Sequence, residues 1–546
     1  MNATVTPMKP LHPVLDIVGL SISLPSGADR ALAVEGATLS VMPGQTLCVV
    51  GESGSGKSMI ANAVMGLLPR PHVAPVAGRI LFDGHDLLQL TEPQMRELRG
   101  RRIGMVFQEP MTALNPVMRI GEQIGEVFDA HGSVPAAEKR RRILAALADV
   151  GLPDPELLID AYPFRLSGGQ RQRVMIACAL VLEPVLLIAD EPTTALDVTT
   201  QAQILALVRE LQQRRGTAVL FITHDFGVVS EIADHVVVMQ TGHVVESGPA
   251  AQVLGAPQHP YTRKLIAAIP DGQAQTVPHD DLTRVLQVQD LCKTYRSSGG
   301  LFKRGRAVQA AKDISFELHR GETLGLVGES GSGKSSVGRC LVGLAPFDSG
   351  RILFKGRNLA QGKSFRRAAA GKIQMVFQDP YASLNPRHRV GAAIAGGPIA
   401  QGVGKAEAMA RAMELLQLVG LGADAAQRYP HEFSGGQRQR IGIARALAMQ
   451  PELLVADEPV SALDVSVQAQ VLELFAQVRA QFQLAMVFIT HDLRVAGQMC
   501  DRIAVMQRGA IVELKPTAQL FAAPEHAYTR ELLAAVPGRK ERAPAA

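Results

Sequence analysis

The stretch Gly51-Glu-Ser-Gly-Ser-Gly-Lys-Ser58 decides the fold of this chain, and the same eight residues recur at Gly328–Ser335. Each copy follows a short apolar run, Gln45–Val50 or Glu322–Val327, and precedes a stretch typical of a helix. A strand that feeds a G-x-x-x-x-G-K-S loop, with a helix leaving it, is the setting of a phosphate-binding loop. The sequence therefore predicts two nucleotide sites.

The residue types of these loops indicate how each would bind a nucleotide. The glycines let backbone N–H groups converge on phosphate oxygens, and the positive end of the next helix adds to the attraction. We expect Lys57 and Lys334 to bridge the β- and γ-phosphates, and Ser58 and Ser335 to hold Mg²⁺. A glycine-rich turn alone would explain neither the lysine nor the serine. The predicted nucleotide-binding residues of the loops are Gly51, Glu52, Ser53, Gly54, Ser55, Gly56, Lys57, Ser58, Gly328, Glu329, Ser330, Gly331, Ser332, Gly333, Lys334 and Ser335.

The duplication extends far beyond the loop, because a series of motifs recurs in the same order with nearly constant spacing. Ser167 and His224, for example, are separated by the same number of residues as Ser434 and His491. The length of 546 residues is about twice what one nucleotide-binding domain needs. We therefore predict a domain over residues 12–270, a polar linker over 271–284, a second domain over 285–537 and a tail over 538–546.

Composition excludes several classes of protein. The chain has 56 basic and 51 acidic residues, a net charge of +5, which gives no reason to expect a nucleic-acid partner. Its five cysteines lie far apart without the spacing of zinc or iron–sulfur ligands, so we expect buried, reduced thiols. No apolar run approaches the roughly 18 residues of a membrane helix, and the start lacks a signal-peptide core. We expect the chain itself to be soluble.

Short continuous apolar runs such as Val185–Ala189, Ala218–Ile222 and Leu453–Ala456 predict parallel strands buried on both faces. Helix-like stretches lie between them, over residues 138–150, 201–214 and 468–480. Alternating segments with glycine turns, Gly78–Phe82 and Gly350–Phe354, predict a smaller antiparallel layer near the start of each half. The expected class is α/β, with a mainly parallel core sheet in each half.

Two acids close a predicted strand in each half, as Asp190-Glu191 and Asp457-Glu458. The aspartates fit a role in holding Mg²⁺, and the glutamates can align and polarise a water that attacks the γ-phosphorus. Neighbouring side chains on a strand point to opposite sides, so both acids can serve one site only where the strand has ended. The proline after each pair supports such an end. The alternative is a solvated pair of charges at a strand end.

A histidine closes the next strand in both halves, in Phe-Ile-Thr-His224 and Phe-Ile-Thr-His491. A lone histidine after a strand is usually structural. Its recurrence after a phosphate loop and an acid pair instead predicts a donor that bonds the γ-phosphate and holds the water-aligning glutamate.

The most specific motif is Leu166-Ser-Gly-Gly-Gln-Arg-Gln-Arg173, which recurs as Phe433-Ser-Gly-Gly-Gln-Arg-Gln-Arg440. With the loops and acid pairs, it resembles the signature of ABC transporter ATP-binding subunits, in the form with two fused nucleotide-binding domains. The resemblance covers Val14–Pro537. It implies two tandem ABC-type P-loop NTPase domains, each adding a helical subdomain to its sheets.

In this family the signature covers the nucleotide held by the opposite half. The resemblance thus implies that Ser434 and Gly436 complete the site of Lys57, Asp190, Glu191 and His224, and that Ser167 and Gly169 complete the site of Lys334, Asp457, Glu458 and His491. Because both motif sets are complete, we predict two hydrolytically competent sites.

Three further positions follow from the resemblance. Gln108 and Gln378, in Val-Phe-Gln-[Glu/Asp]-Pro, are implied to act in catalysis and in binding Mg²⁺. Tyr295 fits the aromatic that stacks on adenine, whereas the aligned position of the first half is Leu24. Base stacking is therefore expected to be weaker in the first site, or to use another side chain.

The end of each half indicates a branch of the family. His259-Pro-Tyr-Thr-Arg263 and His526-Ala-Tyr-Thr-Arg530 resemble the C-terminal signature of dipeptide, oligopeptide, glutathione and nickel ATPases, with Ala527 where that branch usually has proline. A generic amphipathic helix start is the alternative. Many single-domain relatives carry a cysteine cluster beyond this signature; none follows here, so we predict no iron–sulfur centre.

The resemblance implies an ATPase that uses ATP and Mg²⁺ to energise import of peptides, with dipeptide, oligopeptide or glutathione-like cargo. It implies two integral membrane permease subunits, an extracytoplasmic substrate-binding protein, and a peripheral location at the cytoplasmic face of the bacterial inner membrane. The alternative is a twin ABC ATPase that acts on ribosomes or DNA. Such proteins usually carry a long charged linker or zinc-binding modules, and neither is visible.

Overall fold

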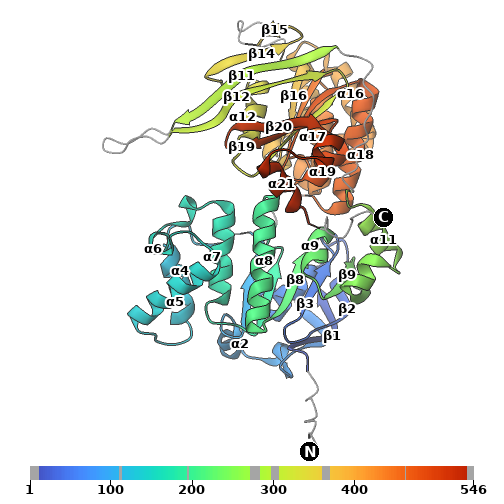
Figure 1. The fold of residues 1–546 in the computed structure, drawn as a ribbon. Helices are drawn as coiled ribbons and strands as arrows, with labels where there is room; N and C mark the ends of the chain where they lie inside the picture. The colour runs from blue at the N-terminus through green and yellow to red at the C-terminus, as the bar shows by residue number, and fades with distance from the viewer. Residues whose placement is uncertain are drawn as a thin grey trace, which may run out of the picture. The chain divides into compact units, whose positions relative to one another are not determined.

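Each half of the chain builds one larger and one smaller sheet, coloured blue to green for the first half and yellow to red for the second (Figure 1). In this computed structural model the described residues are 12–109, 113–193, 196–270, 283–296, 307–359, 369, 371–461 and 463–537. The described chain divides into two compact units, with the main change from one to the other after Ala267. The predicted tail over 538–546, and the predicted linker up to residue 282, lie outside the described residues.

The larger sheet of the first half places the strand that feeds the phosphate loop near its middle. Its strand order is β10-β9-β3-β8-β7-β6, with β10 antiparallel to β9 and the other neighbours parallel. Strands β3, β7 and β8 are buried along their whole length, which explains their continuous apolar sequences. The bounds are β3 (Thr46–Val50), β6 (Ile103–Val106), β7 (Leu186–Asp190), β8 (Ala218–Thr223), β9 (His235–Gln240) and β10 (His243–Pro249).

The smaller sheet is antiparallel, in the order β2-β1-β4-β5. Its strands are β1 (Leu15–Ser23), β2 (Leu32–Val41), β4 (Pro75–Phe82) and β5 (His85–Asp86). The helices of the first half are α1 (Lys57–Val64), α2 (Glu92–Leu98), α4 (Ile120–Asp129), α5 (Ala136–Asp149), α6 (Pro155–Leu158), α7 (Gly168–Leu180), α8 (Val198–Arg215), α9 (Phe226–Ile232), α10 (Ala250–Gly255) and α11 (Pro260–Ala267). Helices α4 to α7 pack on one another beside the sheets and form the expected helical part (Figure 1).

The second half repeats this plan, with a parallel core in the order β16-β17-β18-β13-β19, antiparallel β20 at its edge, and an antiparallel sheet β12-β11-β14-β15. Its strands are β11 (Arg284–Arg296), β12 (Ala307–His319), β13 (Thr323–Val327), β14 (Ser349–Phe354), β15 (Arg357–Asn358), β16 (Ile373–Val376), β17 (Leu453–Asp457), β18 (Ala485–Thr490), β19 (Arg502–Gln507) and β20 (Ala510–Pro516). Its helices are α12 (Lys334–Leu341), α14 (Pro380–Ser383), α15 (Val390–Ala400), α16 (Lys405–Leu418), α17 (Gly435–Leu447), α18 (Val465–Phe482), α19 (Leu493–Met499), α20 (Thr517–Ala522) and α21 (Ala527–Ala534).

The helix that leaves each phosphate loop is held in an apolar core between the two sheets. In the first half Leu20 of β1, Ile60 of α1 and Ile188 of β7 belong to one cluster and are fully buried. Burying such a side chain stabilises the fold by about 1.5–3 kcal/mol. Because α1 begins at the loop lysine, the packing of this helix also fixes the position of the lysine backbone.

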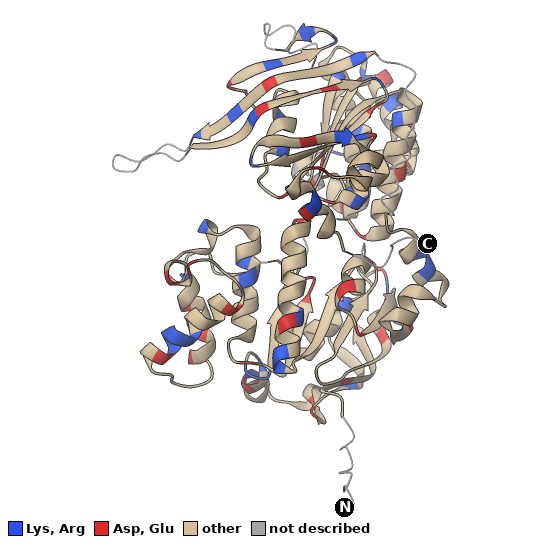
Figure 2. Cartoon of the chain, in the orientation of Figure 1, with Lys and Arg blue, Asp and Glu red and all other residues tan. Residues whose placement is uncertain are grey.

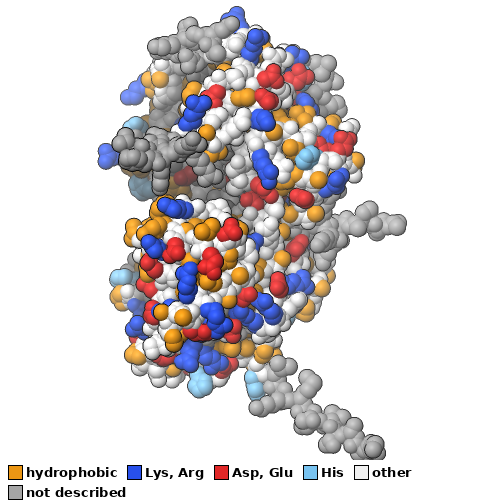
Figure 3. Space-filling view, turned by 60° about the vertical axis from the view of Figure 1, so that its left-hand side comes forward, with side chains coloured by type: hydrophobic (Ala, Val, Ile, Leu, Met, Phe, Trp, Pro, Cys, Tyr) orange, Lys and Arg blue, Asp and Glu red, His pale blue; other side chains and the backbone are white. Residues whose placement is uncertain are grey.

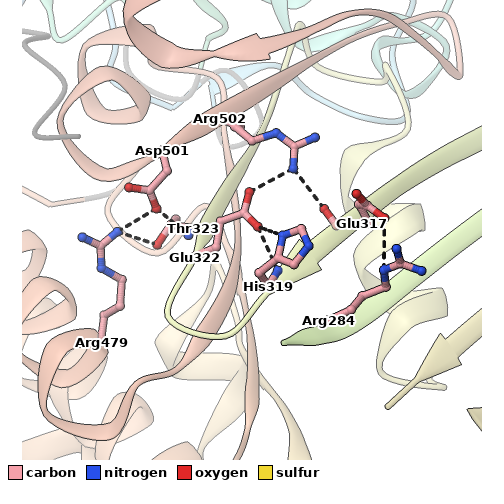
Figure 4. A network of polar contacts seen from close by, with 8 residues as sticks. All are labelled: Arg284, Glu317, His319, Glu322, Thr323, Arg479, Asp501 and Arg502. Carbon is pink, nitrogen blue, oxygen red and sulfur yellow. Dashed lines mark hydrogen bonds and ion pairs between the residues drawn. The ribbon is translucent and has the colours of Figure 1, made fainter. Parts of the chain in front are cut away.

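A network of ion pairs at the start of β13 distinguishes the second half (Figure 4). Asp501 accepts from the Thr323 amide at 2.8 Å and pairs with Arg479 at 3.1 Å. Glu322 pairs with Arg502 at 3.0 Å and lies 2.9 Å from His319 Nδ1. In the first half the repeat places the neutral Gln45 and Gln212 at the positions of Glu322 and Arg479, while Asp234 keeps the bond to the Thr46 amide at 2.7 Å.

On the sides of the molecule that Figures 2 and 3 display, positive and negative side chains of the described residues are interspersed. None of the helices in the described ranges is long and apolar enough to cross a membrane. All five cysteines are free; Cys48, Cys340 and Cys500 are buried, and burial raises the pKa of each of these thiols. Cys178 and Cys292 are only half-buried, which corrects the expectation that every cysteine would be buried.

Candidate nucleotide site in each half

The two phosphate loops connect β3 to α1 and β13 to α12, as the sequence predicts. The last loop residue, Gly56 or Gly333, has a positive φ of 104° or 106°. A Cβ atom would lie 2.6 Å from the Ala33 carbonyl oxygen at Gly56 and 1.9 Å from that of Ala310 at Gly333. Glycine is therefore required at this position both by the backbone angle and by the neighbouring strand.

The loop lysine folds back over its own loop. Lys57 Nζ donates to the carbonyl oxygens of Gly51 at 2.8 Å and Glu52 at 2.9 Å. Lys334 makes the same bonds, at 2.7 Å to Gly328 and 2.8 Å to Glu329. Both lysines are buried, and burial lowers the pKa of Lys334. A phosphate bound in the loop would bring further negative charge to this buried ammonium group.

A serine and an aspartate meet beside each lysine. Ser58 Oγ donates to Asp190 Oδ1 at 2.9 Å, and Ser335 Oγ donates to Asp457 Oδ1 at 2.8 Å. Burial raises the pKa of Asp190 to about 6 and raises that of Asp457, while the serine bonds act in the opposite direction. A buried carboxylate with a hydroxyl offers the oxygen ligands that Mg²⁺ prefers, and a divalent cation would favour its charged form. These residues therefore fit the predicted metal.

The glutamate that follows each aspartate leaves the strand. β7 ends at Asp190, and Glu191 has φ of +47°, in the left-handed region, with its amide donating to the Ile222 carbonyl at 2.9 Å. Glu458 repeats this with φ of +45°. Because the strand has ended, the alternation of side chains no longer separates the two acids. The prediction that each strand ends at its acid pair is confirmed.

Glutamine and histidine hold the carboxylate of this glutamate. Gln108 Nε2 donates to Glu191 Oε2 at 2.9 Å, and His224 Nδ1 lies 3.3 Å from Glu191 Oε1. The three residues follow β6, β7 and β8, whose carboxyl ends meet at one edge of the sheet.

The second half has the same arrangement. Gln378 Nε2 donates to Glu458 Oε2 at 2.9 Å, and His491 Nδ1 lies 3.3 Å from the same oxygen. Burial alone would raise the pKa of Glu458 and lower the pKa of His491. Their mutual hydrogen bond and charge interaction outweigh burial, so the pKa of Glu458 is lowered and the pKa of His491 is raised. An ionised glutamate in this position is the form that can accept a proton from water.

The signature serine begins a helix in each half. Ser167 Oγ accepts from the Gln170 amide at 3.2 Å, and Ser434 Oγ accepts from the Gln437 amide at 3.3 Å. α7 and α17 therefore present their N-terminal ends at Gly169 and Gly436, where a helix attracts phosphate.

The two halves differ at the predicted adenine contact. Tyr295 on β11 is 42 % exposed, and Lys293 Nζ lies 5.0 Å from the centre of its ring. Leu24 instead packs partly buried against the core of the first half. At the predicted adenine contact the second half thus has an exposed aromatic ring, and the first half has an aliphatic side chain.

Sequence reasoning missed three further contacts to the loops, two from tyrosines and one from an arginine. The hydroxyl of Tyr261 accepts from the Glu52 amide at 3.2 Å, and that of Tyr528 accepts from the Glu329 amide at 3.0 Å. Arg30 donates to the Gly54 carbonyl. The tyrosines belong to the repeated His-x-Tyr-Thr-Arg motif, so the repeat marks them in the sequence, but it carries no sign of their partner.

Comparison with known proteins gives two family matches in each half. The family described as "ABC transporter" matches residues 34–194 and 311–461, and "Oligopeptide/dipeptide transporter, C-terminal region" matches 245–292 and 512–544. The chain is 47 % identical to the "Peptidoglycan transport ATP-binding protein YejF" of Agrobacterium fabrum, over 96 % of each chain. It is 46 % identical to the "Glutathione import ATP-binding protein GsiA" of Pectobacterium atrosepticum, over 97 % of this chain and 90 % of that protein.

Proposed function

Since the chain belongs to the ATP-binding proteins of the ABC transporter family, with two ABC domains, we propose that it hydrolyses ATP to drive the import of peptides through separate membrane subunits. The C-terminal region of the oligopeptide and dipeptide branch occurs in both halves and supports a peptide cargo. The relatives named for glutathione import and peptidoglycan transport support the same class of peptide-like compounds.

The observation that carries hydrolysis is the glutamate held by a glutamine and a histidine beside each phosphate loop. Glu191 and Glu458 accept a proton from the water that attacks the γ-phosphorus. Gln108 and Gln378 donate to these carboxylates and orient them. Mg²⁺ held by the Ser58–Asp190 and Ser335–Asp457 pairs, together with Gln108 and Gln378, would neutralise charge on the phosphates.

The proposed domains are 12–270 and 285–537, joined by the linker over 271–284. Family resemblance further supports composite sites, in which Ser434 and Gly436 cover the nucleotide of the first loop and Ser167 and Gly169 cover that of the second. Fusion in one chain makes this encounter intramolecular, with an effective concentration of about millimolar for a short linker.

The names of the relatives, which are import ATP-binding proteins, support separate membrane partners for this chain. The proposed complex has two integral membrane permease subunits and receives cargo from an extracytoplasmic substrate-binding protein. The chain would then lie peripherally at the cytoplasmic face of the bacterial inner membrane.

Glutamate substitution tests the proposed chemistry. Glu191→Gln and Glu458→Gln should each retain ATP binding, and together they should lower kcat by about 10²–10⁴-fold, because a general base is lost. Glu210→Gln, an exposed position of α8, is the control for removal of a negative charge. ATPase rates of the purified transporter measure the effect; wild-type turnover in the double variant would contradict the assignment.

Cargo is tested by growth of a deletion strain on dipeptides, longer peptides or glutathione as the sole source of an essential nutrient. The wild-type gene should restore growth on at least one of them, and the Glu191→Gln/Glu458→Gln gene on none. Equal growth of the deletion strain and its parent on all three would contradict peptide import.

A further inference from the structure

The C-terminal segment of each half contacts the phosphate loop of that half through a buried tyrosine. Tyr261 on α11 is 8 % exposed and Tyr528 on α21 is 4 % exposed. Each hydroxyl accepts from the amide of the second loop residue, Glu52 at 3.2 Å and Glu329 at 3.0 Å. The contact thus occurs in both halves of the chain.

A carboxylate on the edge strand holds the start of the same segment. Glu246 on β10 accepts from the amides of Gln258 at 2.7 Å and His259 at 3.1 Å. His259 Nδ1 in turn accepts from the Tyr261 amide at 3.2 Å. The tyrosine therefore stands on a segment fixed to the core sheet, because β10 pairs with β9, and β9 with β3.

The second half repeats this anchor. Glu513 on β20 accepts from the amides of Glu525 at 2.9 Å and His526 at 3.1 Å, and His526 Nδ1 accepts from the Tyr528 amide at 3.2 Å. Burial raises the pKa of Glu513, but hydrogen bonds from these two amides, from Thr529 and from Lys515 together outweigh burial and bring it to about 2. Glu513 is thus an ionised acceptor at neutral pH, and such hydrogen bonds are among the stronger ones.

The loop residue that receives the tyrosine also holds the loop lysine. Glu52 donates its amide to Tyr261, and its carbonyl accepts from Lys57 Nζ at 2.9 Å. In the second half Glu329 lies in the same way between Tyr528 and Lys334, with the lysine bond at 2.8 Å. In each half, the amide of this loop residue is bonded to the tyrosine and its carbonyl is bonded to the lysine. A shift of the amide would therefore also move the carbonyl that orients the ammonium group.

We propose that Tyr261 and Tyr528 are positioning residues for nucleotide binding, each setting the geometry of the phosphate loop and lysine of its own half. The C-terminal segment characteristic of this branch thereby determines how tightly each half binds nucleotide. This inference rests on the proposed role of the loops as nucleotide sites. Neither tyrosine takes part in the chemical step, because its hydroxyl contacts the loop backbone.

Phenylalanine substitution removes the hydroxyl and keeps the ring that packs against the core. A neutral hydrogen bond contributes about 0.5–1.5 kcal/mol, which corresponds to about a 2- to 12-fold change in affinity. Tyr261→Phe and Tyr528→Phe should therefore raise the Kd for a non-hydrolysable ATP analogue, and KM for ATP, within this range. The value of kcat should stay within about twofold of wild type.

The contributions of the two halves to nucleotide binding are distinguished by substituting one loop lysine at a time in the full chain. With Lys57→Ala, Tyr528→Phe should weaken analogue binding and Tyr261→Phe should leave it unchanged; with Lys334→Ala, the effects should be reversed. Lys264→Ala and Glu531→Ala, at aligned exposed positions of α11 and α21, are matched controls in the same segments. These controls should bind as the wild type does.

Amide hydrogen exchange gives a second readout that does not depend on catalysis. Exchange at the Glu52 or Glu329 amide should become faster in the corresponding Tyr→Phe variant while thermal stability is retained. Wild-type affinity together with unchanged exchange would overturn the inference. Tight binding of the ATP analogue by a Lys57→Ala/Lys334→Ala variant would instead overturn the assignment of the loops as nucleotide sites. This result distinguishes failure of the proposed function from failure of the inference about the tyrosines.

Discussion

At the scale of single residues, the clearest feature is the left-handed backbone of Glu191 and Glu458. Such a conformation costs a non-glycine residue about 1–3 kcal/mol, and it persists where the surroundings determine it. Both halves retain it, with φ of +47° and +45°. Its effect is to release the glutamate from the strand, so that glutamine and histidine contact its carboxylate at the mouth of the loop.

Tyr295 provides a test of the difference between the halves. Tyr295→Leu should weaken ATP binding by the second half about 5- to 150-fold, because stacking of a base on an aromatic ring contributes about 1–3 kcal/mol. Tyr295→Phe keeps the ring and should bind as the wild type does. Leu24→Ala should change first-half affinity little, since no ring is lost. Equilibrium binding of ATP to Glu→Gln variants, which do not turn it over, measures all three.

Sequence reasoning finds the groups that carry chemistry and misses those that support them. Lys57, Asp190 and Glu191 are marked by residue types that a phosphate, a metal and a water require. The sequence marks Tyr261 only as part of a family motif, because its partner Glu52 is 209 residues away in the chain. A tyrosine hydroxyl that accepts from a backbone amide leaves no pattern in the residues around either group.

At the scale of elements, the anchor of the C-terminal segment predicts a dependence of stability on pH. The folded pKa of Glu513 is about 2, below its ordinary value of 4.5. Its stabilising effect is therefore fully present above about pH 4.5 and is lost as pH falls toward 2. Glu513→Gln should be less stable than the wild type at pH 7, and the difference should shrink below pH 4.5. Urea unfolding at several pH values measures it; a constant difference would contradict this role.

The ion-pair network at the start of β13 predicts unequal sensitivity of the two halves (Figure 4). Arg479→Met removes a cation that lies 3.1 Å from Asp501, whose side chain is only 9 % exposed. Removing one partner of a buried pair destabilises a protein by about 3–5 kcal/mol. Gln212→Met, the matched change in the first half, removes one neutral bond to the Gly44 carbonyl and should cost about 1 kcal/mol. Calorimetry that showed equal losses would contradict the network's contribution.

The elements themselves were largely predictable, since continuous apolar runs mark the buried strands and the glycine turns mark the antiparallel layer. Predicted helix limits were short by a few residues, as at α8, expected over 201–214 and found over Val198–Arg215. Helix ends depend on caps and packing that a hydrophobic pattern does not encode.

At the scale of the whole molecule, the duplication of motifs predicts two similar units, and the described chain contains them. The proposed pairing of each loop with the opposite signature rests on family resemblance and is open to a direct test. Lys57→Ala with Ser434→Ala should damage one proposed site and leave the other intact. Lys57→Ala with Ser167→Ala should damage both.

ATPase rates of these two double variants measure the pairing, with Lys334→Ala/Ser167→Ala and Lys334→Ala/Ser434→Ala as the reciprocal set. Residual hydrolysis should be clearly higher in the first variant of each pair. The opposite order would show that each signature serves the loop of its own half.

The contact between Glu329 and Tyr528 also has a consequence for synthesis, because the two residues are 199 positions apart. A ribosome adds roughly 5–20 residues per second, so the second loop is made roughly 10–40 s before the tyrosine that contacts it. The first loop is likewise made before Tyr261, which lies 209 positions after its partner Glu52. The phosphate loop and lysine of each half of a nascent chain should therefore reach their final geometry only when the last helix of that half emerges.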